Sequence, residues 1–362
     1  MDPNEAVRKA EAVLGAARQR GDVAGQVQAL IELGGAYWAM KMADDALSAF
    51  EEARDSARAG GEPRFAAAAD AQIGALLTAI GDYPRALDAI EASLTALRSL
   101  GDRIGQAQVL SAQAVALERS GRLAEAAAAA QEGASLAQET GGKETVLSLC
   151  SLQTRLYEQL GETSMALAAH SQAVKAARSL GKAAPLALAL ERHGACLLAQ
   201  GRLTEALGAT FEALKLQRGR SDDGSADAAY RLTVRLGQIY QQRGAWPEAR
   251  ASFSEALVMC LARGDAALQP YLEASLATAL LGVGDADGAE AAAHQAIEGY
   301  RRLGDDVGVG RSLATLGQLA VLAGDHATAR QVWDEAATLL APLDPDAAAG
   351  VHKLMSQLTP RA

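Results

Sequence analysis

The stretch from Ile73 to Ser93, IGALLTAIGDYPRALDAIEAS, holds a Gly-Asp-Tyr-Pro-Arg-Ala turn between two apolar-patterned segments, and the rest of the chain repeats it. The turn glycine recurs at intervals of forty residues, with one interval of forty-three, at Gly81, Gly121, Gly161, Gly201, Gly244, Gly284 and Gly324. An alanine stands five residues after each of them, and Ala46 has the same place in a first copy whose turn carries Lys41. Repetition at a fixed period of this size predicts a stacked repeat protein.

A second set of glycines lies about twenty residues out of phase, at Gly21, Gly60, Gly101, Gly141, Gly181, Gly264 and Gly304. Glycine past a helix end adopts the left-handed conformation easily, and a following aspartate, as in Gly101-Asp102, can cap the next helix. The first helix of each repeat (helix A) is expected at 23–40, 63–80, 103–120, 143–160, 183–200, 226–243, 266–283 and 306–323. The second (helix B) is expected at 43–59, 83–99, 123–139, 163–179, 203–218, 246–262, 286–302 and 326–341.

We expect three parts: an N-terminal capping helix in 1–22, the repeat array in 23–341, and a C-terminal capping helix with a tail in 342–362. Terminal units of an array need a polar outer face, which these flanking helices would supply. The one break in register falls in 218–225, where three additional residues stand between repeats five and six. This segment is either a tolerated loop insertion or a hinge or contact loop that divides the array into five and three repeats.

Composition and charge narrow the class of protein. The 362 residues carry a formal net charge of −10, which argues against nucleic acid as a partner, since such proteins normally present a basic stripe. No apolar segment approaches the roughly 18 residues that cross a bilayer, so no membrane insertion is expected. The N-terminus lacks the pattern of a secretory signal, and the three cysteines are far apart, as is typical of reduced thiols. These features predict a cytoplasmic protein.

Aligning the repeats on the alanine reveals further regular positions. A small residue stands seven places after it in every repeat, and twelve places before it stands Gly34, Gly74, Ala114, Thr154, Gly194, Gly237, Ala277 or Gly317. A bulky residue stands four places after it in the clearest repeats, at Phe50, Ile90, Phe253 and Trp333. The resulting Leu-Gly-x-x-Tyr, Gly-Asp-Tyr-x-x-Ala, Phe-x-x-Ala pattern resembles the tetratricopeptide repeat. HEAT and armadillo units have a similar length, but the Gly and Ala positions favour the tetratricopeptide interpretation.

This resemblance covers 23–341, and the period of forty is similar to the longer variety found in kinesin light chains and bacterial regulatory tetratricopeptide proteins. It implies an all-α fold, a right-handed superhelix of eight helix-turn-helix repeats with capping helices. It also implies that helix A lines a concave groove that binds a protein or peptide. The residues expected on that wall are Gln28, Trp38, Gln108, Arg119, Arg155, Glu158, Arg231, Gln238, Gln241, Gln242, Tyr271, Arg311 and Gln318.

Two interpretations of these wall residues remain open. Arginine and glutamine can bind the carboxylates and backbone amides of a peptide, or these side chains form an ordinary solvated helix face. Trp38 is either an aromatic anchor for a partner or a residue that packs against the preceding helix.

No catalytic pattern is present. The five histidines are scattered, and the pair His193 and Cys196 is too small a set for a tetrahedral zinc site, which needs four ligands. We therefore expect no enzymatic activity, no cofactor and no metal. The leading hypothesis is an interaction scaffold. The alternative is a ligand- or peptide-responsive regulator of a bacterial signalling or transcription system, and self-association through the terminal repeats is a further hypothesis.

Overall fold

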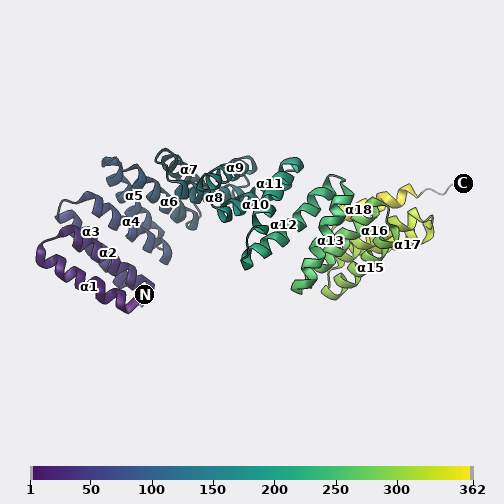
Figure 1. The fold of residues 1–362 in the computed structure, drawn as a ribbon, viewed down its shortest axis with the longest axis horizontal. Coiled ribbons are helices and arrows are strands. Elements are labelled where there is room, and N and C mark those ends of the chain that lie inside the picture. Colours follow the sequence, from purple (N-terminus) through teal and green to yellow (C-terminus); the bar gives the residue numbers. More distant parts are fainter. Residues whose placement is uncertain (1–2, 359–362) are drawn as a thin grey trace. The chain divides into compact units, whose positions relative to one another are not determined.

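The structure is a computed structural model that describes residues 3–358, and all its regular elements are α-helices (Figure 1). In chain order these are α1 (Pro3–Arg20), α2 (Val23–Ala39), α3 (Ala43–Ala59), α4 (Pro63–Ile80), α5 (Tyr83–Ser99), α6 (Arg103–Arg119), α7 (Leu123–Glu139), α8 (Lys143–Gln159), α9 (Thr163–Leu180), α10 (Ala183–Ala199), α11 (Leu203–Arg218), α12 (Asp223–Gln242), α13 (Trp246–Arg263), α14 (Gln269–Val283), α15 (Ala286–Leu303), α16 (Asp306–Leu322), α17 (His326–Leu340) and α18 (Pro345–Gln357). The predicted all-α class and the alternation of A and B helices are confirmed. The ends of the expected flanking segments, 1–2 and 359–362, lie outside the described residues.

The described residues divide into two compact units, one ending at Lys182 and the other beginning at Ala183. Within each unit every helix packs against the next one along the chain. The first unit contains α1 followed by the hairpins α2/α3, α4/α5, α6/α7 and α8/α9. The second contains α10/α11, α12/α13, α14/α15 and α16/α17, followed by α18. Each unit therefore holds four complete repeats and one additional helix.

The turns between helices depend on one residue with positive φ. Fourteen glycines have this conformation, and Lys41 (φ 62) is the one other described residue that shares it. Lys41 thus keeps the backbone conformation of the glycine that its repeat lacks, although a side chain makes that conformation unfavourable. One assignment is corrected: the left-handed residue after α3 is Gly61 (φ 72), whereas Gly60 has a φ of −82. A Cβ at position 60 would lie 2.6 Å from the Val23 side chain, so close packing explains this second glycine.

Two helix boundaries also differ from expectation. Helix α14 begins at Gln269 and not at 266, because a start at 266 would place Pro270 inside the helix, where it has no N–H and clashes with the preceding turn. The three additional residues near 218–225 lengthen α12, which has 20 residues and begins at Asp223. The link from α11 to α12 is therefore only residues 219–222.

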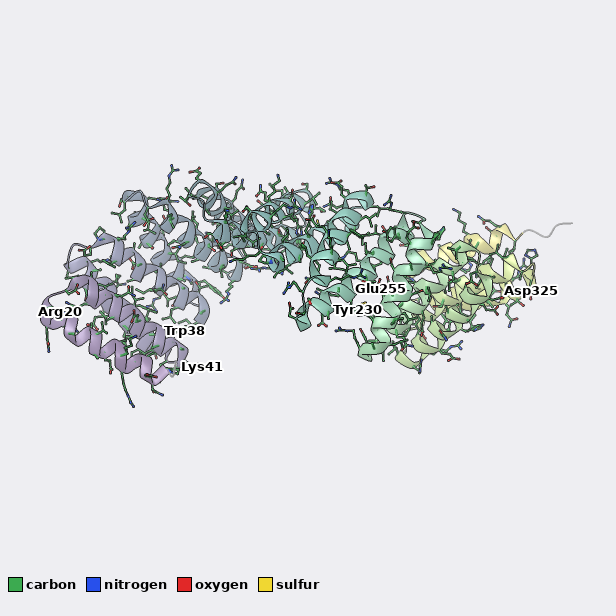
Figure 2. All side chains as sticks on the ribbon, in the orientation of Figure 1. Arg20, Trp38, Lys41, Tyr230, Glu255 and Asp325 are labelled. Carbon is green, nitrogen blue, oxygen red and sulfur yellow. The ribbon has the colours of Figure 1, made fainter. Side chains whose placement is uncertain are left out.

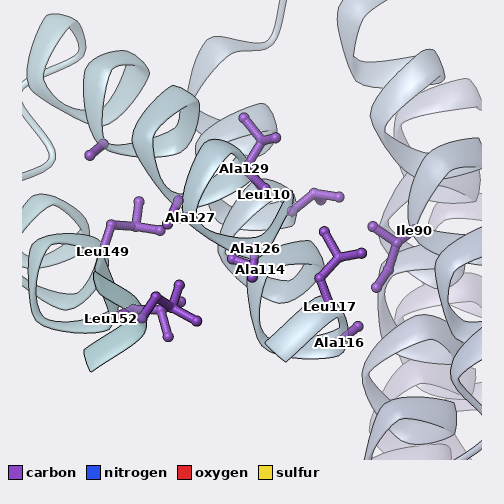
Figure 3. Packing of buried hydrophobic residues seen from close by; sticks show 14 of the residues in the cluster. Ile90, Leu110, Ala114, Ala116, Leu117, Ala126, Ala127, Ala129, Leu149 and Leu152 are labelled. Atoms are coloured by element: carbon purple, nitrogen blue, oxygen red, sulfur yellow. The ribbon is translucent and has the colours of Figure 1, made fainter. Parts of the chain in front are cut away.

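The core lies between the A and B helices of each repeat. The eight repeated alanines are at most 2% exposed, at Ala46, Ala86, Ala126, Ala166, Ala206, Ala249, Ala289 and Ala329. Buried side chains then continue from one repeat to the next. The largest cluster runs from α4 to α9, and Figure 3 shows the part of it between Ile90 and Leu152. This continuity explains how repeats that are too small to fold alone form a stable unit.

The small residue on helix A faces the bulky residue on helix B of the same repeat. A Cβ added at Gly34 would lie 2.5 Å from the Phe50 ring, and one added at Gly237 would lie 2.5 Å from the Phe253 ring. Phe50 also packs with Ile73 of α4, so the same ring fills the junction to the next repeat. The glycine is thus required by the close approach of two helices.

Two adjacent glycines of α2 provide a test of this constraint. Gly34→Ala should lower the free energy of unfolding by about 1–3 kcal/mol, because the new methyl group overlaps the Phe50 ring. Gly35→Ala should raise it by about 0.5–1 kcal/mol, because Gly35 has open space around its Cβ direction and alanine favours the helix. Urea titrations monitored by circular dichroism measure the change in the free energy of unfolding for each variant. Equal effects of the two substitutions would contradict the crossing geometry.

Candidate functional site

In the first unit, polar contacts link the A helices of successive repeats. Arg119 of α6 donates from Nη1 to the carbonyl oxygen of Thr78 in α4, at 3.4 Å. Arg155 of α8 makes two hydrogen bonds of 2.7 Å to the carboxylate of Glu118 in α6. Helices α2 and α4, α4 and α6, and α6 and α8 are also in direct contact. The A helices of this unit thus form one continuous surface, which we call the first A surface (α2, α4, α6 and α8).

The first A surface contains a groove of about 360 Å³ between α4 and α6, above α5. Small residues make up most of its α4 side, at Ala67, Ala68, Ala71 and Ala75. Gln72 and Gln108 add amides to the lining, and Leu97 and Val109 are its larger buried apolar residues. The groove therefore offers a shallow apolar surface bordered by hydrogen-bonding groups.

An ion pair lies in the lining of this groove. Arg64 donates from Nη2 to Oδ2 of Asp102 at 2.8 Å, and Asp102 caps α6 by accepting from the Gly105 amide at 3.0 Å. The hydrogen bond from Gly105, followed by that from Arg64, holds the pKa of Asp102 below its ordinary value. Asp102 is therefore ionised at neutral pH. Its charge is neutralised by Arg64, and its position is fixed by the helix that it caps.

In the second unit a buried carboxylate links two helices, α10 and α12, of the second A surface (α10, α12, α14 and α16). Glu191 of α10 is 7% exposed and accepts from Nε of Arg231 in α12 at 3.0 Å. The carbonyl oxygen of Glu191 accepts from Arg235 at 2.6 Å, and burial lowers the pKa of Arg235. The other carboxylate oxygen of Glu191 has no hydrogen-bond partner among the described residues. Among the described residues Arg231 therefore provides the hydrogen bond to the Glu191 carboxylate, and Arg235 adds a second positive charge nearby.

The predicted wall residues are all at the surface, and none of the thirteen is buried. The structure brings Gln238 and Tyr271 together directly, with Gln238 Nε2 donating to the Tyr271 hydroxyl at 2.7 Å. Arg119 and Arg155 lie on adjacent helices beside Glu118, and Gln108 lines the groove.

The other predicted wall residues lie apart from the contacts described above and from the groove between α4 and α6. Arg311 pairs with Asp344 at 2.6 Å, Gln28 donates to Glu32 at 3.2 Å, and Glu158 lies 3.1 Å from His170 of α9. Trp38 is 41% exposed near the C-terminal end of α2 (Figure 2), so it is only partly packed. Gln241 and Gln242 of α12 and Gln318 of α16 lie at the surface, apart from the residues described above.

Sequence reasoning missed the ion pair of Arg64 with Asp102, the hydrogen bond of Arg235 to the Glu191 carbonyl, and Asp344 as the partner of Arg311. A signal for them exists, because oppositely charged residues separated by about one period tend to face each other across a repeat junction. Arg64 and Asp102 are 38 residues apart, and Arg231 and Glu191 are 40 apart. In both pairs the arginine therefore finds its carboxylate in the neighbouring repeat.

Reactive side chains are dispersed over the described residues. No group of three or more His, Cys, Asp or Glu side chains there could hold a metal ion. Cys150 and Cys260 are buried and Cys196 is half-buried, and within residues 3–358 none of the three forms a disulfide. In residues 3–358 no helix combines the length and apolarity that crossing a bilayer requires.

No model of a known protein family matches the sequence, and no curated protein matches it. Solved structures do match, at low identity. One is a signal-transduction ATPase with numerous domains and a tetratricopeptide-repeat sensor from Pyrococcus horikoshii, with 14% identity and a TM-score of 0.58 over 98% of this chain and 55% of that one. The chain therefore spans about half the length of that protein.

Two further solved structures are similar to this chain in fold. The apo form of RapI has 13% identity and a TM-score of 0.55 over 93% of this chain and 86% of that one. The C-terminal part of a tetratricopeptide-repeat protein from Cytophaga hutchinsonii has 15% identity and a TM-score of 0.51 over 78% of this chain and 98% of that one. At these identities the likeness concerns the fold.

The dependence of Glu191 on Arg231 yields a prediction about stability. Arg231→Ala should lower the free energy of unfolding of the second unit by about 1–3 kcal/mol, because it leaves a buried acceptor without its partner. Arg302→Ala, at an exposed position of α15, should change it by less than about 0.5 kcal/mol. Thermal and urea unfolding give both values. The inferred dependence of Glu191 on Arg231 is wrong if the double variant Arg231→Ala with Glu191→Gln recovers none of the free energy of unfolding that Arg231→Ala loses.

Proposed function

Because the chain has the tetratricopeptide-repeat fold, we propose that it is a non-catalytic scaffold that binds a peptide or protein segment on its A helices. The observation that carries this proposal is the groove between α4 and α6, whose lining is rich in alanine. Small side chains leave room for the side chains of a partner, and helix-lined grooves of this kind bind amphipathic segments through a few apolar anchors.

Contacts between successive A helices support their assignment to the inner wall of each unit. Elements on the inner side of a curved stack lie closer together than those on the outer side. Helices α4 and α6 touch, and so do α10 and α12. On this proposal the predicted wall residues of both units face the partner.

The arginines would act differently from the glutamines. Arg155 and Arg231 already pair with Glu118 and Glu191, so a partner carboxylate would have to compete with an intrachain one. Glutamine amides at positions such as Gln108 need no such exchange, and each can donate and accept hydrogen bonds to a peptide backbone. The proposed partner is therefore held by shape and amide contacts more than by charge.

The remaining parts of the proposal follow from composition and pattern. The net charge of −10 disfavours nucleic acid as a partner, and the sequence offers no arrangement of nucleophile and base for catalysis. We propose a cytoplasmic location, action without a cofactor, and self-association, where it occurs, through the helices at the two ends of the array.

The groove between α4 and α6 can be tested with paired substitutions. Peptides selected from a random library against the unmodified chain should bind Ala75→Arg about tenfold more weakly, because the long side chain fills the groove. Ala75 is exposed, so the helix should tolerate the change. Ala124→Arg, on an exposed position of α7, is the matched control. Fluorescence anisotropy measures the dissociation constants, and equal affinities for the two variants would place the site elsewhere.

A second candidate is a ligand-responsive regulator, and the division of the chain after Lys182 favours it. The similar Pyrococcus horikoshii structure is described as containing a sensor. Small-angle scattering with and without a selected peptide distinguishes the two candidates. A regulator should change its radius of gyration on binding, whereas a rigid scaffold should not.

A further inference from the structure

A separate cavity of about 520 Å³ lies in the first unit, over α8 and between the B helices α7 and α9. Its lining comprises Gln131, Ala134, Ser135, Ala137, Gln138, Gly141, Lys143, Val146, Cys150, Gln153, Gln172, Lys175, Ala176 and Ser179. None of these residues lines the groove between α4 and α6. The α8 members recur at three- and four-residue steps, so the cavity follows one face of α8 for about 15 Å. Its volume falls within the range of small-molecule sites.

The charge of this cavity is opposite to that of the chain. The lining contains two lysines and no acidic residue, although the whole chain has a net charge of −10. Lys143 donates from Nζ to the carbonyl oxygen of Ser179 at 2.9 Å, and the exposed Lys175 has no ion pair among the described residues. The nearby carboxylates of Glu144 and Glu139 are paired with Lys182 and Arg103, respectively. The two lining lysines thus keep their positive charge available.

The N-terminus of α8 adds to this positive end. Gly142 is the N-cap residue of α8, and it has no side chain to accept from the first-turn amides. Asp102, by contrast, caps α6 with its carboxylate. An uncapped helix N-terminus presents amide hydrogens and the positive end of the helix dipole, both of which favour an anion. Lys143, the first residue of α8, lies at this end.

The other end of the cavity holds a buried amide whose oxygen atom is unpartnered. Gln153 is 4% exposed, and its Oε1 atom has no hydrogen-bond partner among the described residues. A buried amide without a partner is unfavourable for folding, and such groups in native proteins usually meet a ligand, ion or water. Burial raises the pKa of the neighbouring Cys150 thiol to about 11, so it is neutral and adds no charge. Gln153 therefore offers a hydrogen-bonding group that the protein itself does not use.

We propose that this cavity binds an elongated small organic anion. Its carboxylate or phosphate group would lie beside Lys143 and Lys175 at the N-terminus of α8, and a polar group about 10–15 Å away would hydrogen-bond to Gln153. None of the residues that line this cavity lines the groove between α4 and α6, so the proposal does not rest on the scaffold function.

Three related probes test the charge requirement and distinguish the two kinds of anion. They are 8-acetamidooctanoate, 8-acetamidooctyl phosphate and the uncharged 8-acetamidooctanamide, whose chains are long enough to reach from the lysines to Gln153, and each is titrated into the full chain by isothermal calorimetry or ligand-observed NMR. At least one anion should bind about tenfold more tightly than the neutral amide, and the preferred one identifies the head group. The proposal is overturned if the amide binds equally well, or if neither anion binds at about 10 mM, an upper limit for a ligand of this size.

Substitutions assign the binding to this cavity. Lys175→Glu should raise the dissociation constant of the preferred anion about tenfold, because attraction becomes repulsion. Lys215→Glu makes the same charge change on an exposed position of α11 in the other unit and should leave it unchanged. Ala75→Arg should leave it unchanged as well, which separates this proposal from the peptide groove. Equal dissociation constants for Lys175→Glu and the unmodified chain would overturn the assignment.

Gln153→Leu separates a ligand-binding amide from a structural one. It should weaken anion binding about fivefold and, at the same time, raise the melting temperature, because an apolar side chain replaces an unpartnered buried amide. A lower melting temperature together with unchanged anion binding would make Gln153 a structural residue and would contradict the proposal.

Discussion

The close crossing of helix A over helix B is the contact on which every repeat depends. Gly34 and Gly237 leave the space that the Phe50 and Phe253 rings occupy. Where helix A carries alanine, helix B is reduced to match: Ala277 lies in one buried cluster with Ala293. In these repeats a larger residue on one helix is offset by a smaller one on the other. The repeat with Thr154 and His170 departs from this pattern, because both of its residues are larger than the alanine pair.

A uniform hairpin allows the repeats to stack, and the stack is held mainly by apolar contact. The buried cluster from α4 to α9 passes through successive repeats without interruption. Arginines and glutamates on successive B helices also pair across the junctions, as in Arg98 with Glu132 and Arg301 with Glu335. These pairs are exposed, and each contributes about 0–1 kcal/mol at most. Their spacing of 34 residues matches one repeat junction, so they favour the correct alignment of neighbours more than overall stability.

The sequence predicted the helices well because their ends are encoded locally, whereas the binding surface depends on contacts between repeats. A glycine with positive φ and a following cap determine each turn, and Lys41 could be placed by period alone. Errors arose where another local preference was stronger, as with Pro270, which delays the start of α14. The partners of Arg155 and Arg231 lie 37 and 40 residues earlier, and a pattern read along one helix cannot reveal them. The same limit applies to Gln153, whose lack of a partner is a property of three packed helices.

A charged residue in a repeat array can be paired within the chain or be available to a ligand, and the sequence does not distinguish these two roles. Glu191 is buried, and Arg231 compensates it, so this arginine is committed to stability before any partner arrives. Breaking such a pair to bind a new carboxylate exposes the desolvation penalty of the old one. Lys175 carries no such commitment, and its charge is free to act on a ligand. The number of cations on a surface therefore overstates its capacity for anions, and the useful measure is how many of them lack a carboxylate within the chain.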